Sequence, residues 1–455
     1  MDVGNIAELN TFLLLDAIRS RGEATRRQLG RELGLSDASV SRIVKRLLAT
    51  GIIEELPGEG AMRGRTPSIL RFVGPAGGVI AVDLGGTRCH GALADLAGGT
   101  LATDYREPSA PAGDRDAAGT LLSCIEALKS AARDLGIPVR AVVVGIPALI
   151  DPVSQLAVAG PNVHWQGFDL LGILRDRLSE PFEVDNDVNL AALGEAWRGQ
   201  GRGIQSFVTM SLGTGIGGAV VIDGHLVRGS HNAAGEVGYF PFWRWPAPGL
   251  AASGPAAPGL AASGLAASGP AASGPAASGS AAPGSAAPGS TAPGLTAPAG
   301  RQGFEDVASG PALRARAATL LARPAGSRPG LRDGFGVADV FAAAARGDAL
   351  GLQVVTELTT HVAAAITGIT ALVDPERVIL DGAIGRALEP WLPGLRDAVA
   401  AGVFRPPEIV VSGLGPDAAV TGAIARALAL VSEQDAPAQL TRHVMRRPGV
   451  PAHRP

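Results

Sequence analysis

Residues 79–87 read Val-Ile-Ala-Val-Asp-Leu-Gly-Gly-Thr, and residues 207–218 read Phe-Val-Thr-Met-Ser-Leu-Gly-Thr-Gly-Ile-Gly-Gly. Each stretch is an apolar run of strand length that enters a glycine-rich turn, and a second strand-like run follows each turn. Such a hairpin lets backbone N–H groups approach phosphate oxygens. Because the unit occurs twice, about 130 residues apart (Asp83 to Gly213), we predict two phosphate loops in an α/β fold.

The two turns differ from the common nucleotide-binding loops. Walker and Rossmann loops open into helices, whereas both of these turns return to strands. Asp83 ends the first strand, where a carboxylate can hold Mg²⁺ through water. The candidate phosphate- or nucleotide-binding residues are Asp83, Gly85, Gly86, Thr87, Gly213, Thr214 and Gly215.

A third polar segment lies between the two loops. Residues 182–187 read Phe-Glu-Val-Asp-Asn-Asp, and a helix is predicted over 188–198. A carboxylate such as Asp187 at a strand end, beside phosphate loops, is suited to deprotonate a sugar hydroxyl for attack on a γ-phosphate. The alternative is that Asn186 and Asp187 only cap the helix. The residues alone leave both interpretations open.

The N-terminal segment predicts three short helices. Apolar residues recur at helical spacing over 5–20, Thr25 can cap a second helix that runs to Leu33, and Ser36 or Asp37 can cap a third that stops at Gly51. Residues 52–56 and 68–72 then predict a β-hairpin whose tip carries arginines.

Two helices joined through a glycine-containing turn, with a basic outer face on the second, indicate a helix-turn-helix. In DNA the third predicted helix would lie in the major groove, and the hairpin would be the wing, with its arginines suited to a narrow minor groove. Three-helix winged domains also serve as protein-interaction modules, which is the alternative. The candidate DNA-binding residues are Ser36, Ser39 and Arg42 toward the bases, Lys45 and Arg46 toward phosphates, and Arg63 and Arg65 on the wing.

The composition limits the classes of protein. Charged residues make up 18% of the 455 and the net charge is −3, so any DNA contact must be a local patch. The two cysteines, Cys89 and Cys124, form no CxxC pair and indicate no disulfide framework. The N-terminus lacks the pattern of a signal peptide, and apolar stretches such as 141–150 are too short for a membrane span. We therefore expect a cytoplasmic protein without a membrane partner.

Residues 246–300 stand apart from the rest of the chain. The segment contains no Asp, Glu, Lys or Arg and repeats Ala-Ala-Ser-Gly-Pro and Ala-Ala-Pro-Gly with small variations. Such a tract cannot bury enough apolar surface to offset its ordering entropy, so a disordered insertion is predicted. Residues 433–455 are predicted to form a flexible tail.

With these motifs in view, the sequence resembles the ROK family of repressors, open reading frames and sugar kinases, from about Gly4 to Ala429 without the insertion. The head resembles the branch of xylose and N-acetylglucosamine repressors. The resemblance implies a winged helix-turn-helix (1–72) followed by a duplicated, actin-like, ribonuclease-H-like sugar-kinase fold (75–245 and 301–432).

The resemblance also implies roles for single residues. Asp83–Thr87 and 212–217 look like the family's two phosphate loops, and 378–382 looks like its adenosine-side strand. In kinase members the aspartate at the position of Asp187 is the catalytic base. Residues 161–165 and 234–238 look like sugar-side segments. The sugar-binding residues implied in this way are Asn162, Asn186, Asp187, Glu236 and Glu305.

Three departures from the family pattern stand out. Family members place a histidine after the Ala-Gly-Glu-x-Gly segment and three cysteines further on, which together hold a structural zinc. Here Tyr239 takes the histidine position and the cysteines are absent, so we expect no zinc or other metal site. Asp381 takes the place of a glycine in the adenosine-side strand.

These observations favour a repressor that a sugar or sugar phosphate releases from double-stranded operator DNA, with no cofactor needed for repression. One alternative is a sugar (hexose) kinase that uses ATP and Mg²⁺ and retains the head. The other is a degenerate sensor that binds DNA without a sugar response. A homo-oligomer is expected, because a palindromic operator needs two heads. Neither the sugar nor the operator can be read from the sequence.

Overall fold

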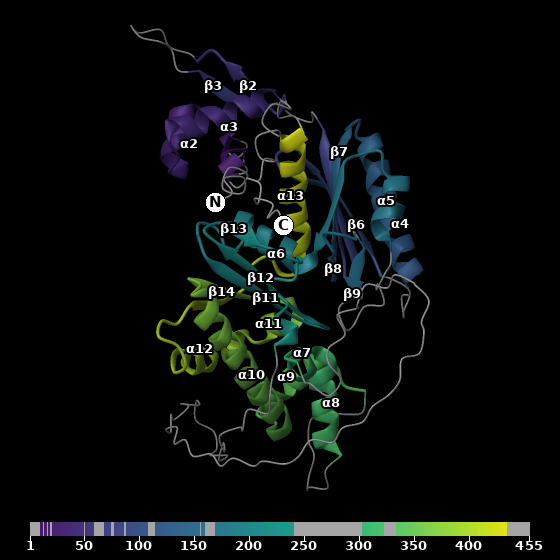
Figure 1. Ribbon diagram of the computed structural model, residues 1–455, viewed down its shortest axis with the longest axis vertical. Coiled ribbons are helices and arrows are strands. Elements are labelled where there is room, and N and C mark those ends of the chain that lie inside the picture. The colour runs from purple at the N-terminus through teal and green to yellow at the C-terminus, as the bar shows by residue number, and fades with distance from the viewer. Residues whose placement is uncertain are drawn as a thin grey trace, which may run out of the picture.

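The structure is a computed structural model. It describes residues 10–11, 13–15, 17–18, 21–49, 51–58, 68–73, 77–85, 88–107, 114–154, 156–159, 169–240, 303–322 and 334–434. A small head lies at one end of the molecule, and two α/β lobes follow it along the long axis (Figure 1). Asn162, Arg63, Arg65, Gly86, Thr87, the 246–300 insertion and the tail beyond 434 lie outside the described residues.

The head is a winged helix-turn-helix. Helix α2 (Arg26–Leu33) has a capping box in which Thr25 and Gln28 exchange hydrogen bonds, and Gly34 ends it with φ of 65°. Helix α3 spans Asp37–Ala49, and its first turn is capped by Ser36, whose Oγ accepts from Ser39 N at 3.3 Å. Strands β2 (Ile53–Leu56) and β3 (Ile69–Phe72) form the predicted hairpin. A two-residue strand, β1 (Glu23–Ala24), joins it as a third strand that the sequence did not indicate.

The first lobe is built on a five-stranded sheet in the order β10-β7-β4-β5-β6. Ile80 and Val82 of β4 pack on the side of helix α4, whereas Val79 and Ala81 pack on the side of α13, so this strand is buried on both faces. That explains its unbroken apolar sequence. A two-stranded ribbon adjoins the sheet. The bounds are β4 Gly78–Leu84, β5 Cys89–Asp95, β6 Thr100–Arg106, α4 Asp114–Asp134, β7 Val139–Ile146, β8 Ala148–Ile150, β9 Ala157–Ala159, α5 Leu170–Arg177 and β10 Phe182–Asn186.

The second lobe repeats the plan with a sheet in the order β13-β12-β11-β14-β15. Helix α6 packs on one face of this sheet, and helices α7 to α12 build the hydrophobic core on its other face. The bounds are β11 Phe207–Leu212, β12 Ile216–Ile222, β13 His225–Val227, η1 Val237–Tyr239, α7 Glu305–Ala308, α8 Gly310–Leu321, α9 Val337–Ala345, α10 Ala349–Val373, β14 Arg377–Asp381, α11 Gly382–Ala387, η2 Glu389–Trp391, α12 Leu392–Ala400, β15 Glu408–Val411 and η3 Gly415–Asp417.

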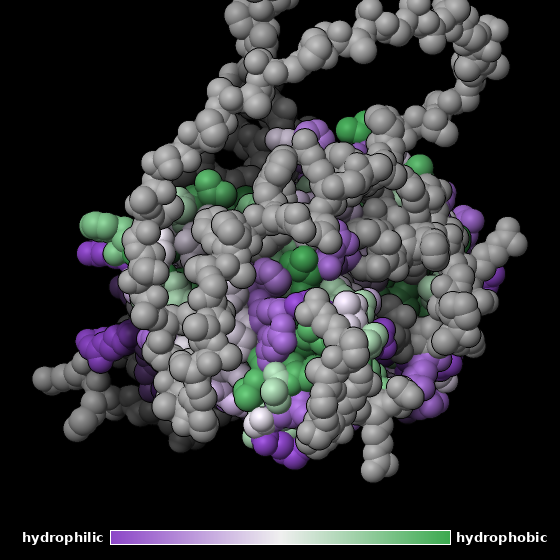
Figure 2. All heavy atoms as spheres, turned by 90° about the horizontal axis from the view of Figure 1, so that it is seen from below, coloured by the Kyte–Doolittle hydropathy of each residue, from purple (hydrophilic) through white to green (hydrophobic). Residues whose placement is uncertain are grey.

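Helix α10 has the length and apolar composition of a membrane span, which the sequence analysis did not single out. Residues from Val354 to Ile369 belong to the core of the second lobe, and Leu350 and Val373 near the helix ends pack against it. The helix therefore packs as the core helix of this lobe. On the described surface seen from below, hydrophilic and hydrophobic residues are interspersed (Figure 2).

Two helices cross at the junction of the lobes. Helices α6 (Asp187–Arg198) and α13 (Ala418–Gln434) meet at Gly194 and Gly422. A Cβ on Gly422 would lie 1.7 Å from Leu190 O, and one on Gly194 would lie 2.3 Å from Ala418 O. Only glycine permits this approach of the two backbones. Because α13 also packs on the first sheet while α6 packs on the second, this crossing joins the lobes.

Candidate functional site

The site lies between the lobes, where the carboxyl ends of β4 and β10 meet the start of β12. Asp83 is the last residue but one of β4, and its neighbour in the sheet, Gly145, would place a Cβ 3.6 Å from both Asp83 Oδ1 and Asp187 Cα. Asp187 begins α6 directly after β10. The structure therefore brings together the first phosphate loop and the predicted base, because parallel strands present their carboxyl ends at one edge of the sheet.

Asp83 is buried, with 4% of its surface exposed, and its Oδ1 has no hydrogen-bond partner among the described residues. Burial raises its pKa to about 6; the Arg88 charge opposes this shift, and the Asp381 charge adds to it. An unpartnered, desolvated carboxylate is a costly arrangement for folding alone. Such a group is suited to bind a cation or a hydroxyl.

The structure shows that Asn186 caps the helix, and the role of Asp187 as a base stays a prediction. Asn186 is the N-cap of α6, and its side-chain oxygen accepts from Val188 N at 2.9 Å and Asn189 N at 3.2 Å. Asp187 lies in the first turn, where burial and the charges of Asp83 and Glu236 raise its pKa well above the usual range. The helix cap therefore exists, and it places the Asp187 carboxylate beside two further acids.

The second lobe contributes Glu236 and Glu305. Burial, with the Glu305 charge, raises the pKa of Glu236 to about 7. Glu305 accepts a hydrogen bond from Ile216 N at 2.9 Å, which fixes it beside the end of the second phosphate loop. Gly235 adopts φ of 93°, and a Cβ there would lie 2.1 Å from Gly218 O, so the Ala-Gly-Glu turn requires glycine.

Tyr239 lies beside the same two carboxylates. Burial, followed by the charges of Glu236 and Glu305, raises the pKa of the Tyr239 phenol to about 12. At the histidine position of the family pattern the chain therefore presents a neutral hydroxyl. A phenol both donates and accepts hydrogen bonds, as a sugar-reading group must.

The second phosphate loop is attached to the start of helix α8. Gly213 O accepts from Gly310 N at 2.8 Å, at the start of α8, and Gly213 N donates to Gly215 O at 3.0 Å. Thr214 is exposed at the tip of this turn. The start of α8 therefore holds this loop in place.

Asp381, at the end of β14, faces the same region. It is 8% exposed, and its Oδ1 lies 3.4 Å from Arg386 Nη1. Its charge raises the pKa of Asp83, so the two carboxylates lie close enough to repel one another.

The residues on the second lobe do not fit a structural zinc site. Zinc sites of this kind take thiolate and imidazole ligands, but residues 237–304 contain neither Cys nor His. Within the described ranges, no three His, Cys, Asp or Glu side chains are placed to hold a metal ion. Phe304, fully buried, fills the core at this point, and its N–H donates to Phe240 O at 2.9 Å.

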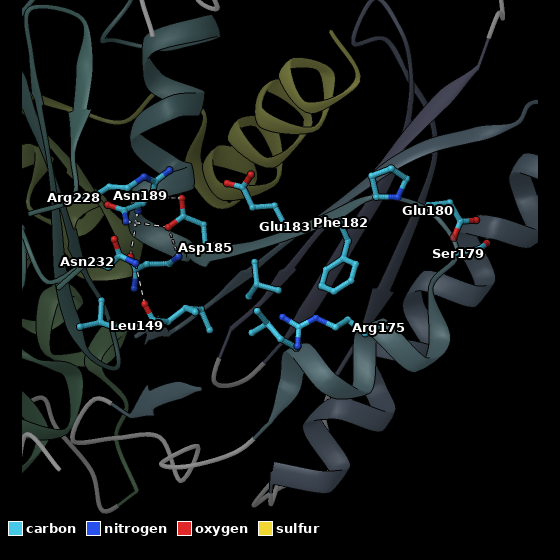
Figure 3. A pocket seen from close by; sticks show the side chains of 15 residues that line it. Leu149, Arg175, Ser179, Glu180, Phe182, Glu183, Asp185, Asn189, Arg228 and Asn232 are labelled. Atoms are coloured by element: carbon cyan, nitrogen blue, oxygen red, sulfur yellow. Dashed lines mark hydrogen bonds and ion pairs between the residues drawn. The ribbon is translucent and has the colours of Figure 1, made fainter. Parts of the chain in front are cut away.

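A cavity of about 680 Å³ extends along β10 from Asn186, with Asp185 and Arg228 at its polar end (Figure 3). Asp185 accepts from Asn186 N, Asn189 Nδ2 and Arg228 Nη1 at 2.8, 3.1 and 2.6 Å. Asp185, Arg228 and Asn232 were not among the predicted site residues. Only their nearness in sequence to the predicted site residues could have indicated them.

The DNA-binding candidates on α3 are arranged as a recognition helix requires, with one exception. Ser36, Arg42 and Lys45 are exposed, and Ser39 is half-buried beneath Ser36. Arg46, predicted to contact phosphate, instead donates from Nη2 to Thr11 Oγ1 at 3.2 Å. This guanidinium joins α3 to the first helical segment, so a phosphate would have to compete with Thr11.

A pair of contacts joins the wing to the head. Arg26 of α2 binds Glu55 of β2 through both terminal nitrogens and donates to Ser68 Oγ at 3.0 Å. Arg71 of β3 pairs with Glu54. The base of the predicted wing is therefore held at a fixed angle to the helix-turn-helix.

Comparison with known proteins agrees with this architecture. The sequence model of the ROK family matches residues 79–430, and that of the MarR family matches residues 8–63. The xylose repressor of Caldicellulosiruptor bescii is 27% identical over 234 residues, a match that covers 51% of this chain and 59% of the repressor.

Two solved structures share the fold. A ROK family transcriptional regulator, described as a homolog of the Escherichia coli MLC protein, superposes with a TM-score of 0.68 at 21% identity over 95% of this chain and 98% of its own. A ROK family glucokinase from Streptomyces griseus, in complex with glucose and AMPPNP, gives a TM-score of 0.54 at 26% identity over 77% and 99%.

Fold and site together define a two-lobed, actin-like sugar-kinase architecture that carries a winged helix-turn-helix head. The chain belongs to the ROK family.

Proposed function

We propose that the chain is a transcriptional repressor that a sugar releases from operator DNA. One observation carries the proposal: the same chain has an exposed basic recognition helix and a group of acidic residues between two lobes. Sugar hydroxyls would donate to Asp187 and Glu236, one from each lobe, and so favour a closed cleft. Closure would turn the heads of an oligomer out of register with the operator.

The head supports DNA as the partner. Its recognition helix presents Arg42 and Lys45 to solvent, and the wing base is held by the Arg26–Glu55 pair. A homo-oligomer is part of the proposal because a two-fold operator needs two heads. The similarity to a xylose repressor supports the sugar as effector class, and a pentose belongs in any panel of candidates.

The alternative is an ATP-dependent sugar kinase. The glucokinase similarity and the Asp83–Asp187 arrangement favour it, because Asp187 could take the proton of a sugar hydroxyl and Asp83 could hold magnesium through water. Bound nucleotide would supply the phosphoryl group. Asp381 and Tyr239 oppose this alternative, since the first puts a carboxylate on β14, the strand that resembles the family's adenosine side, and the second replaces the family's histidine.

The test is a fluorescence-anisotropy titration of operator DNA from the region upstream of the gene, with a panel of pentoses, hexoses and their phosphates. A parallel assay measures ADP release with ATP and Mg²⁺. Release from DNA without ADP formation supports the repressor. ADP formation at an enzymatic rate supports the kinase, and DNA binding that no sugar changes supports the degenerate sensor.

We also propose that the protein needs no zinc. Elemental analysis of purified protein should find no stoichiometric zinc, and chelation should leave the melting temperature unchanged. One tightly held zinc per chain would contradict this proposal.

A further inference from the structure

The loop from Arg228 to Glu236 belongs to the second lobe, but it is attached to the first lobe at two points. Arg228 Nη1 donates to Asp185 Oδ2 at 2.6 Å, and Asn232 Nδ2 donates to Ile150 O at 2.9 Å. Both acceptors lie in the first lobe, on β10 and β8. Figure 3 shows Arg228, Asn189 and Asn232 gathered around Asp185 at one end of the cavity.

Asp185 is the shared anchor of this arrangement. Its Oδ1 fixes the backbone of Asn186 and the side chain of Asn189, while its Oδ2 takes Arg228. Its side chain is 9% exposed, so the ion pair is shielded from solvent on the acid side. One carboxylate therefore sets the position of the Asn186–Asp187 pair and of the Arg228 loop.

The loop itself is closed, so that a displacement of Arg228 is passed on to Glu236. Ala234 N donates to Arg228 O at 3.1 Å, and Glu236 N donates to Ala233 O at 3.4 Å. At the loop's end Gly235 packs directly against Gly218 of β12. The segment is thus a compact turn between the tether and the acid that faces Asp187.

We propose that Arg228 is a positioning residue that tethers the two lobes and sets the affinity of the cleft for its sugar. By holding the loop against Asp185, it keeps Glu236 of the second lobe near Asp187, which directly follows β10 of the first lobe. The proposal rests on the proposed function for its effector, although the tether can be tested without any sugar. Loss of Arg228 opens the cleft and raises the sugar concentration needed for release from DNA.

The first test measures the separation of the lobes. Leu135 and Leu372, which are 53% and 79% exposed on the first and second lobes, are replaced by cysteine and spin-labelled. Cys89 and Cys124 are buried and stay unlabelled. Without sugar, Arg228→Met should shift or broaden the distance distribution, and Arg228→Lys should give an intermediate result.

The matched control is Arg316→Met. Arg316 pairs with Glu357 within the second lobe, and its side chain is 37% exposed, the same fraction as that of Arg228. The Arg316→Met variant removes a comparable ion pair without changing the junction of the lobes, so its distance distribution should equal that of the wild type.

The second test titrates operator complexes with the sugar that releases the wild type. Arg228→Met should raise the midpoint about tenfold, while sugar-free operator affinity is retained or increased, because the open cleft is the DNA-binding state. Arg316→Met should leave the midpoint unchanged.

The outcomes separate the two proposals. Unchanged distances in Arg228→Met overturn the tether, whatever any sugar does. A changed distance with an unchanged midpoint overturns the positioning role. If the distances change but no sugar releases the wild type, the tether stands and the proposed function fails.

Discussion

Sugar binding would change the pKa of the Glu236 carboxyl group. Burial and the Glu305 charge raise its pKa to about 7, above the value in an unfolded chain. The protonated Glu236 therefore stabilises the sugar-free fold at low pH. This contribution to the free energy of unfolding is lost as pH rises from the pKa of the unfolded chain through about 7. A sugar hydroxyl donates a stronger hydrogen bond to the ionised carboxylate than to the protonated carboxyl group, so binding lowers this pKa and releases a proton.

We therefore expect sugar affinity to rise between about pH 6 and about pH 8 and then to level off. Below the pKa of Glu236 in the sugar-free protein, the rise should reach up to roughly tenfold per pH unit. Calorimetry in buffers of different ionisation enthalpy measures the released proton. Glu236→Gln should flatten the dependence. As a control, Glu357→Gln changes an acid whose pKa is lowered by Arg316 and should keep the wild-type curve. A wild-type affinity independent of pH would contradict the assignment.

At this scale, the residues that follow strand ends were predictable and those that act across the lobes were not. Asp83 terminates an apolar run and Asp187 follows the polar end of a predicted strand, which marks both in the sequence. Arg228 and Asp185 are 43 residues apart and belong to different sheets, so only the fold brings them together. Arg46 was predicted to contact DNA because it lies on the outer face of its helix. In the fold it donates to Thr11, a partner that the sequence did not indicate.

The recognition helix α3 supports a prediction about base contacts. Arg42 is exposed near its N-terminal half, where such helices reach base edges. Arg42→Ala should weaken operator binding by about 1–3 kcal/mol and relax specificity at one base pair. Arg405→Ala removes the same charge from an exposed position in the second lobe and serves as control. Equal anisotropy curves for the two variants would argue against this role of α3.

The crossing of α6 and α13 predicts a packing effect. Gly422→Ala places a methyl group against Leu190 O, which forces the helices apart and should lower the free energy of unfolding by about 1–3 kcal/mol. Gly368→Ala in α10 meets no atom within 4 Å and should be neutral or stabilising. Chemical denaturation measures both variants. A destabilisation no larger in Gly422→Ala than in Gly368→Ala would show that the crossing can relax.

Elements with local signals were predictable, and those without them were not. Helix α2 begins after Thr25 and ends before Gly34, as the cap and the glycine indicated. Strand β1 has two residues, too few for any periodicity, and it exists because β3 offers it a partner. The apolar run of α10 gives no sign that it is a core helix until its neighbours are known.

For the whole molecule, the insertion should be dispensable for folding. Phe240 and Phe304, on either side of it, are joined by a hydrogen bond from Phe304 N to Phe240 O, so a short Gly-Ser bridge can replace residues 246–300. The tract has no charged residue and no aromatic residue to contribute to a core. Differential scanning calorimetry of the deletion variant should give a melting temperature within a few degrees of the wild type. A large drop would show that the tract packs.

The last prediction concerns the coupling between the head and the cleft. If a sugar weakens operator binding by some factor, operator DNA must weaken sugar binding by the same factor, because both are legs of one thermodynamic cycle. Couplings of this kind span about 5- to 150-fold, so the effect is measurable from either side. Asp187→Asn should raise the sugar needed for release while leaving sugar-free operator affinity unchanged, since the cleft acid does not belong to the head. The measurement is a pair of sugar titrations, with and without saturating operator, on the wild type and this variant. Unequal factors in the wild type would mean that a second process, such as a change of oligomeric state, accompanies release. If Asp187→Asn weakens DNA binding without sugar, the acid supports the fold that presents the heads and does not act through the sugar alone.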